Sequence, residues 1–156
     1  MSIEKVRDYF RQWKMDDRVL EFPESSATVE LAAKAVDCEP ARIAKSLSFQ
    51  VNENCILLVT AGDSRIDNGK YKSCFGIKAK MLSADKVKDF TGFEVGGVCP
   101  LGIPAGTAVY LDISLKRFNS VYPACGSSNS AIELTLEELE QHSHATDWID
   151  VCRGWT

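Results

Sequence analysis

The chain of 156 residues is long enough for one domain with its own hydrophobic core, because a chain of this length buries about two thirds of its unfolded surface. With 18 basic against 22 acidic residues its formal net charge is −4, a poor balance for a protein that grips duplex nucleic acid by the phosphates. The 6 cysteines stand singly, with no CxxC pair and no histidine at ligand spacing, so neither a metal site nor a disulfide framework is expected.

The N-terminal segment has the pattern of an amphipathic helix. Apolar residues recur at helical spacing from Ile3 to Trp13, which predicts a first helix over residues 2 to about 15, opened by Ser2. The segment is too charged for a signal peptide, and no apolar run in the chain approaches the ~20 residues that a membrane span requires. We therefore expect a soluble, cytoplasmic protein without a membrane partner.

Two more helices are predicted before the centre of the sheet. Residues 19–22 read as a short strand, and Thr28 is a suitable N-cap for a second helix over the apolar positions that follow it. Pro40 suits the first turn of a third, short helix that ends near Lys45. A strand is expected directly after that point.

A hairpin is predicted at the centre of the sheet. Residues 47–51 and 55–61 are β-rich runs that flank a polar turn. A lysine-rich, helical piece then extends to Phe75, and Ser83 caps a further helix through Phe90.

The remainder of the chain adds strands and one more helix. The expected strands are residues 108–113, 121–122, 131–134 and 148–152. Thr135 opens a capping box for a helix that ends near His142. No repeat, low-complexity tract or linker is present, so the expected fold class is α+β: a single domain over residues 1–156, with a mixed, largely antiparallel sheet flanked by helices.

The most informative segment is residues 96–102, Gly-Gly-Val-Cys-Pro-Leu-Gly. Glycine allows a positive φ or a close approach to a ligand, and proline fixes φ and removes a donor. The segment is therefore interpreted as a shaped main-chain loop that can bind a ligand with its peptide groups. A tight connection between two strands is the alternative, because glycine and proline are common in turns.

Two catalytic motifs are poorly supported. Gly62 and Gly69 are separated by six residues where a phosphate-binding P-loop has four, and Tyr71 stands where that motif has Ser or Thr, so nucleotide hydrolysis is not expected. The only histidines, His142 and His144, lie at the end of a polar helix, where an exposed or capping role is favoured over a place in a catalytic triad.

Two single residues could carry chemistry. Cys99 could act as a nucleophile if loop N–H groups stabilised its thiolate, but no histidine follows it, and a small buried thiol is the alternative. Lys45 lies at the predicted junction of a helix and a strand, where a side chain can point into a cleft, although a lone lysine is ordinarily a surface residue.

A local group of basic residues could contact a few phosphates even though the whole chain is acidic. Its alternative is a solvated face. The group consists of Arg65, Lys70, Lys72, Lys78 and Lys80.

Four segments in order resemble one known family. They are Thr28 to Ala33, Arg42 to Leu47, Ala61 to Asp67, and Thr91 to Gly102. Together they resemble the YbaK and prolyl-tRNA synthetase associated editing-domain family, over residues 17 to 152. An ordered match of this kind is far more specific than any one of the segments.

The resemblance implies a YbaK-like fold and a trans-acting aminoacyl-tRNA deacylase. Such an enzyme proofreads translation by hydrolysing the ester between a wrong amino acid and the terminal adenosine of a tRNA, most often tRNA for proline. It implies no metal, no cofactor and no covalent nucleophile. The implied partners are the acceptor end of a mischarged tRNA and prolyl-tRNA synthetase.

The resemblance also implies roles for particular residues. Lys45 helps to anchor the tRNA end, and the main chain around Gly96 and Gly97 surrounds the reacting carbonyl or the ribose hydroxyls, so these three are the expected catalytic residues. The expected substrate-binding residues are Phe22, Thr28, Val98, Cys99, Pro100, Gly126, Ser127 and Asn129. The expected tRNA-binding residues are Arg65, Lys70 and Lys72.

The amino acid that is removed stays open among Ala, Ser, Cys and Thr. Asn129 and Ala131 stand where many relatives carry a charged residue, which puts specificity for cysteine in doubt. Two other functions also stay open: a non-catalytic module that binds a tRNA acceptor end or a synthetase, and a hydrolase of unrelated esters.

Overall fold

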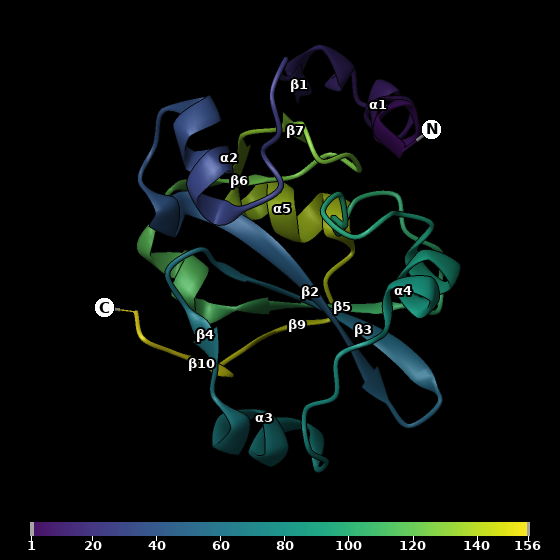
Figure 1. Ribbon diagram of the computed structural model, residues 1–156, viewed down its shortest axis with the longest axis vertical. Helices are drawn as coiled ribbons and strands as arrows, with labels where there is room; N and C mark the ends of the chain where they lie inside the picture. The colour runs from purple at the N-terminus through teal and green to yellow at the C-terminus, as the bar shows by residue number, and fades with distance from the viewer. Residues whose placement is uncertain (1, 156) are drawn as a thin grey trace.

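A six-stranded mixed sheet forms the centre of the computed structural model, which describes residues 2–155 (Figure 1). The strand order is β8-β6-β2-β3-β5-β9. These strands are β2 (Ile43–Val51), β3 (Asn54–Ala61), β5 (Ala108–Asp112), β6 (Ser120–Pro123), β8 (Leu134–Thr135) and β9 (Asp147–Ile149). Two small sheets pair β1 (Leu20–Glu21) with β7 (Ser130–Ala131), and β4 (Arg65–Ile66) with β10 (Cys152–Arg153).

Five α-helices and three 3₁₀ helices occur within the same residues. The α-helices are α1 (Ser2–Arg11), α2 (Val29–Val36), α3 (Asn68–Phe75), α4 (Ala84–Thr91) and α5 (Leu136–Ser143). The 3₁₀ helices are η1 (Asp16–Arg18), η2 (Pro40–Arg42) and η3 (Ile113–Arg117).

The sheet is mixed, as predicted. The long β2–β3 hairpin is antiparallel, as are β6–β8 and both small sheets, whereas β2–β6, β3–β5 and β5–β9 are parallel. In the hairpin, Lys45 lies opposite Thr60 and Val51 opposite Asn54. Because side chains alternate along a strand, Ser46 and Lys45 project from opposite faces of the sheet.

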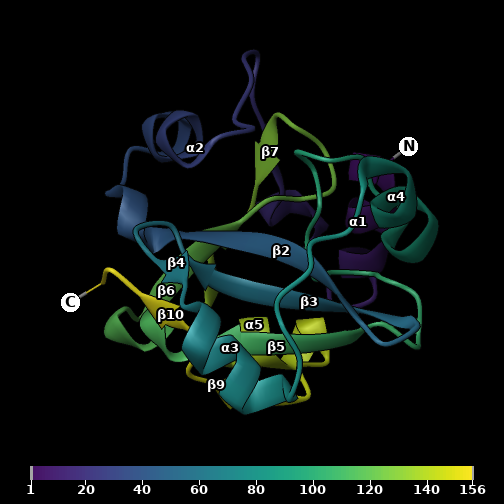
Figure 2. The same cartoon turned by 60° about the horizontal axis from the view of Figure 1, so that its bottom comes forward.

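Hydrophobic side chains cover both faces of the sheet. On one face Phe10 of α1 and Leu139 of α5 belong to the cluster that contains Leu57 of β3. On the other face Tyr71 of α3 packs in the cluster that contains Leu58. Figure 2 shows α2 and α3 on opposite sides of the hairpin.

Local capping explains where several helices begin. Thr28 accepts a hydrogen bond from the Leu31 amide, as predicted for the N-cap of α2. Thr135 and Glu138 form the predicted capping box of α5. Ser83 occupies the predicted N-cap position of α4, but its side chain makes no capping hydrogen bond. The predicted capping role of the Ser2 side chain lies outside the described residues.

Four predicted boundaries were wrong. The first helix ends at Arg11 rather than near residue 15, because Lys14 adopts a positive φ of 58° and the chain turns into η1. The strand β2 begins at Ile43, so Lys45 lies inside a strand and not at a helix–strand junction.

The other two errors concern strands that were predicted as continuous. Residues 131–134 divide into β7 and β8, because the Ile132 amide donates to the Pro123 carbonyl and turns the chain between them. Residues 148–152 divide into β9 and β10, because the Val151 amide donates to the Asp112 carboxylate instead of to a strand partner.

The Glu138 carboxylate should stabilise the fold in a pH-dependent way. Hydrogen bonds from Arg18 lower its pKa to about 2, so it favours the folded state above its unfolded pKa of about 4.3, and this contribution is lost as the pH falls toward 2. We expect Glu138→Gln to lower the free energy of unfolding at pH 7 and the difference from the wild type to vanish near pH 2. Urea titrations across this range measure it, and a pH-independent difference would contradict it.

Candidate functional site

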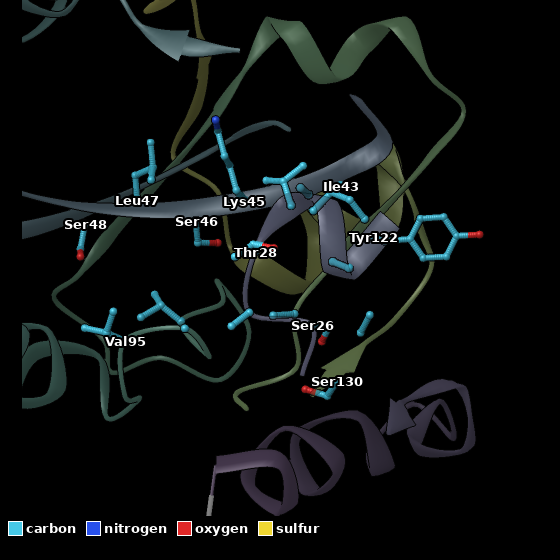
Figure 3. Close-up of a pocket in the computed structure, with 18 of the residues that line it drawn as sticks. Ser26, Thr28, Ile43, Lys45, Ser46, Leu47, Ser48, Val95, Tyr122 and Ser130 are labelled. Carbon is cyan, nitrogen blue, oxygen red and sulfur yellow. The ribbon is translucent and has the colours of Figure 1, made fainter. Parts of the chain in front are cut away.

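A cavity of about 360 Å³ opens along the edge of β2. Its walls come from β2, from the segment before α2, from Val95, Gly96 and Val98, and from β7 (Figure 3). Alanine, valine and glycine make up much of the lining, with hydroxyl groups among them. The lining includes Ser26, Thr28, Lys45, Ser46, Met81 and Gly96.

The cavity lies where β2 lacks a neighbouring strand. On this edge β6 pairs with β2 only as far as Ala44 opposite Pro123. Further along, the Leu82 amide donates to the Ser48 carbonyl and the Gln50 amide donates to the Lys80 carbonyl. Peptide groups alternate along a strand, so those of Ser46 face the same edge, between the two partners.

The side chains of β2 lie on both sides of this edge. Figure 3 shows Ser46 and Ser48 on the side of Thr28 and Val95, and Lys45 and Leu47 on the opposite side. All four β2 residues line the cavity. Ser46 and Ser48 therefore share the side of β2 on which Thr28 and Val95 line the cavity, and Lys45 and Leu47 border it from the other side.

Lys45 is half-buried, and its ammonium group is held by the chain itself. Its Nζ donates to the Ser64 carbonyl at 2.5 Å. Burial lowers the pKa of Lys45, an effect opposed by Cys152, Asp63 and Glu30 and reinforced by Arg65. Lys45 thus supplies a positive charge beside the cavity, on the other side of β2 from Ser46.

The turn that holds Lys45 is itself braced. The Ser64 hydroxyl donates to the Ala61 carbonyl at 2.6 Å, and Asp63 accepts two hydrogen bonds from Arg117 at 2.6 and 2.9 Å. These bonds lower the pKa of Asp63. A Cβ on Gly62 would lie 2.1 Å from the Pro40 carbonyl oxygen, so only glycine allows this close approach.

The glycine-rich loop contributes to the cavity with only part of its length. Gly96 and Val98 line the cavity, and Gly96 has a φ of 96°. Gly97 is buried outside the lining and its amide donates to the Glu94 carbonyl at 3.0 Å, so this N–H is already used. A Cβ on Gly97 would lie 2.8 Å from the backbone of Gly126, which explains why the position needs glycine.

Cys99 and Pro100 are buried residues of the same loop and do not line the cavity. Burial raises the pKa of the Cys99 thiol to about 12, far from the range in which a thiolate acts as a nucleophile. Cys99 is therefore a small buried thiol, which was the alternative to a nucleophile in the sequence analysis.

Phe22, Ser127 and Asn129, which the resemblance implied as substrate-binding residues, belong to a hydrogen-bonded cluster beside the cavity. The Asn129 amide side chain donates to the Phe22 carbonyl at 2.9 Å, and the Phe22 amide donates to the Asn129 carbonyl at 2.7 Å. The Ser127 hydroxyl contacts Asn129 and Ser130 at 2.9 and 2.7 Å. Phe22, Gly126, Ser127 and Asn129 do not line the cavity, whereas Ser130 does. These hydrogen bonds hold in place the part of the wall that carries Ser26 and Ser130.

The predicted tRNA-binding residues lie outside the cavity lining. Arg65 is exposed and close enough to affect the pKa of Lys45. Lys70 donates to Asp150 and to the Cys152 carbonyl, both at 3.0 Å, and Lys72 is exposed on α3. The structure thus brings only Arg65 of the three near Lys45.

The histidines differ from the prediction in one respect. His144 is exposed at the C-cap of α5 with a φ of 52°. His142 is buried, because its ring packs against Phe10 and Trp13 with centroids 5.6 and 4.3 Å away. Burial lowers its pKa.

The sequence interpretation missed several residues of the cavity wall. Ser26, Ser46, Met81 and Tyr122 all line it. For Ser46 a signal exists: Ser46 and Ser48 alternate with Lys45 and Leu47 in a strand whose partner strand is almost wholly apolar. Met81 and Tyr122 carried no comparable signal.

Residues 2–155 hold neither a metal-binding cluster nor a membrane-spanning helix. No group of three or more His, Cys, Asp or Glu side chains in this part of the chain is arranged to hold a metal ion. None of its helices is long and apolar enough to cross a membrane.

Comparison with known sequences gives a family match over most of the chain. The model of the aminoacyl-tRNA editing domain matches residues 23–141. The chain is 54% identical to the uncharacterized protein YwhH of Bacillus subtilis over 156 residues, which is 99% of each chain. It is 23% identical over 130 residues to a proline–tRNA ligase of Bacillus cytotoxicus, covering 83% of this chain and 22% of that enzyme.

A solved structure is similar over nearly the whole chain. It is described as a candidate trans-editing enzyme for prolyl-tRNA synthetase, is 30% identical in sequence, and superimposes with a TM-score of 0.88 over 98% of both chains. The fold is therefore that of this group of structures, as the sequence resemblance implied.

Proposed function

Because this chain belongs to the aminoacyl-tRNA editing domain family, we propose that it hydrolyses the ester that joins a wrongly attached small amino acid to tRNA for proline. The reaction is a proofreading step of translation, carried out in trans and in the cytoplasm. The solved neighbour described for prolyl-tRNA synthetase supports the choice of tRNA, and that synthetase is the partner we propose.

The observation that carries the proposal is the cavity at the open edge of β2. Its volume of about 360 Å³ is at the small end of the range for ligand sites. Lys45 lies on one side of the edge, and Gly96 faces it from the glycine-rich loop. An aminoacyl ester needs a site of this kind, with a small side-chain pocket and polar groups around the carbonyl.

Hydrolysis of an aminoacyl ester needs few catalytic groups from the protein. An ester is already activated, so a site can act by positioning a water and by stabilising the charge that develops on the carbonyl oxygen, with each well-placed donor worth ~3 to 4 kcal/mol. In our proposal Lys45 holds the terminal nucleotide of the tRNA, and main-chain groups around Gly96 surround the ester. Gly97, whose amide is already bonded to Glu94, acts through the shape of the loop.

The charge distribution supports a contact with the tRNA end. Between residues 65 and 90 seven basic residues occur with three acidic ones, although the whole chain has a net charge of −4. Met81, Leu82 and Val87 of this segment line the cavity. A lysine-rich segment therefore borders the cavity, with Lys70 and Lys88 paired to Asp150 and Glu94, and an acceptor end with few phosphates needs few free cations.

The size of the cavity supports a small amino acid. Alanine at positions 27, 32, 44, 124 and 131 contributes to the walls. Editing by a second site is needed for small amino acids, because one methylene group discriminates by only ~1 to 3 kcal/mol in the synthetic site. We propose Ala, Ser, Cys or Thr as the amino acid removed.

A panel of mischarged tRNAs tests this function. Transcripts of tRNA for proline and for alanine, each charged with Ala, Ser, Cys, Thr or Pro, are incubated with the purified protein, and the remaining ester is measured over time. We expect at least one small amino acid on tRNA for proline to be released at least 100-fold faster than proline. Hydrolysis of none of them, with tRNA still bound, would overturn the proposal in favour of a binding module.

A further inference from the structure

The peptide groups and the hydroxyl of Ser46 lie on the cavity wall without hydrogen-bond partners from residues 2–155. Its peptide N–H and C=O face the open edge of β2, past the last pairing with β6 and before the first bond to residues 80–82. Its Oγ is shielded from solvent and has no hydrogen-bond partner within residues 2–155. A buried hydroxyl without a partner disfavours the unliganded site, so a ligand that pairs with it binds more tightly.

The neighbouring hydroxyl groups differ from Ser46. The Thr28 hydroxyl accepts from the Leu31 amide, and the Ser130 hydroxyl accepts from the Cys125 amide. The Ser48 carbonyl accepts from Leu82. Ser46 is thus the position on this wall where a carbonyl oxygen faces the open edge and a hydroxyl oxygen has no partner within residues 2–155.

On this basis we propose that the carbonyl and hydroxyl oxygens of Ser46 bind the free α-ammonium group of the aminoacyl ester. The inference rests on the proposed function and adds a feature to the substrate: its amino group must be unblocked. An ammonium group carries three donors and no acceptor, which suits a pair of oxygens. The Lys45 charge projects from the opposite side of β2 and is bonded to Ser64, so it does not occupy this position.

The proposal has a consequence for selection among tRNA esters. Peptidyl-tRNA and N-formylated initiator tRNA carry an amide in place of the ammonium group. An amide N–H donates one bond where the ammonium donates three, and its acyl group would run against the β2 edge. Because both esters lose this contact with Ser46, the enzyme would hydrolyse them more slowly than an aminoacyl ester.

The test combines three substrates with two variants. Wild type, Ser46→Ala and Ser48→Ala are assayed on tRNA for proline carrying alanine, lactate, in which a hydroxyl replaces the amino group, or N-acetylalanine. Each kcat/KM is divided by the uncatalysed hydrolysis rate of the same ester, because the ammonium group also activates the ester chemically. Ser48→Ala is the matched control, two residues along the same face of β2.

We expect the wild type to prefer alanyl over lactyl ester at least tenfold after this correction, and to cleave the N-acetyl ester at least 100-fold more slowly. Ser46→Ala should reduce the alanyl preference at least threefold, and Ser48→Ala should leave it unchanged. Equal corrected rates on alanyl and lactyl esters would overturn the inference while leaving the proposed deacylase intact. Inactivity on all mischarged tRNAs would instead remove the proposed function.

A fourth substrate, the seryl ester on the same tRNA, tests whether Ser46 binds another part of the substrate. If the wild type prefers seryl over alanyl ester and Ser46→Ala removes that preference without changing the ratio of alanyl to lactyl rates, the hydroxyl binds the amino-acid side chain. That outcome overturns the proposal. Circular dichroism and thermal unfolding of each variant confirm that the comparison is made between folded proteins.

Discussion

Replacing Lys45 by alanine is expected to lower the deacylation rate of mischarged tRNA at least tenfold while the fold persists. The ammonium group lies beside the cavity and is held on the Ser64 carbonyl at 2.5 Å. Removing it takes away the positive charge that we propose for holding the tRNA end. Single-turnover deacylation with saturating enzyme separates this effect on the reaction from a loss of tRNA affinity.

The stability of Lys45 variants provides an independent check. Burial lowers the pKa of Lys45, so the folded state disfavours the ammonium form relative to the unfolded chain. This penalty is present at neutral pH and is relieved as the pH rises through the folded pKa toward the unfolded value. Lys45→Met, which keeps the aliphatic stem, should therefore retain or raise the Tm while losing activity.

Lys116→Ala is the control for nonspecific loss of positive charge. Lys116 is an exposed lysine whose Nζ lies 4.7 Å from the centre of the Trp148 ring, and it does not line the cavity. We expect its variant to deacylate at the wild-type rate. A Lys45→Ala protein that is folded and as active as the wild type would remove Lys45 from the proposed mechanism.

Replacing Gly96 by valine is expected to abolish deacylation, with a loss of at least 100-fold. Gly96 has a φ of 96°, a conformation that a β-branched residue rarely adopts. A Cβ there would lie 3.7 and 3.8 Å from the Cβ atoms of Ala27 and Ser128, so the further methyl groups of valine would crowd this part of the loop, where Gly96 and Ala27 line the cavity. Both effects displace the loop from the ester.

Gly106→Val is the matched control for backbone strain. Gly106 also has a positive φ, 113°, but no atom lies within 4 Å of its added Cβ and it does not line the cavity. We expect both valine variants to lose similar stability and only Gly96→Val to lose activity. If Gly96→Val deacylates as fast as Gly106→Val, the loop is a connection between segments and not part of the site.

Local patterns predicted much of the secondary structure. The hairpin, the N-cap at Thr28 and the capping box at Thr135 depend on residues that are close in sequence, and all three are confirmed. The errors occurred where distant residues decide the outcome. Val151 leaves a predicted strand because its amide bonds to Asp112, 39 residues earlier in the chain.

The candidate site was only partly predictable for the same reason. The ordered segments identified the family and selected Thr28, Lys45 and Gly96, which the structure brings to one cavity. The sequence could not show which of the eight expected substrate-binding residues line the cavity and which only stabilise its walls. Asn129 and Phe22 bond to each other and brace a wall, and the Gly97 amide is already used by Glu94.

The family and the α+β class could be predicted from the sequence, because these depend on residue types in a fixed order. Which polar groups are left without a hydrogen-bond partner depends instead on how distant segments pack together. Near Gly126, the Asn129 side chain is already bonded to the carbonyl of Phe22, a residue far away in sequence. At Ser46 the edge of β2 is open, because the pairing of β2 with β6 ends at Ala44. A backbone group is available to a ligand only where no other part of the chain has taken its hydrogen bond, and that is a property of the folded molecule.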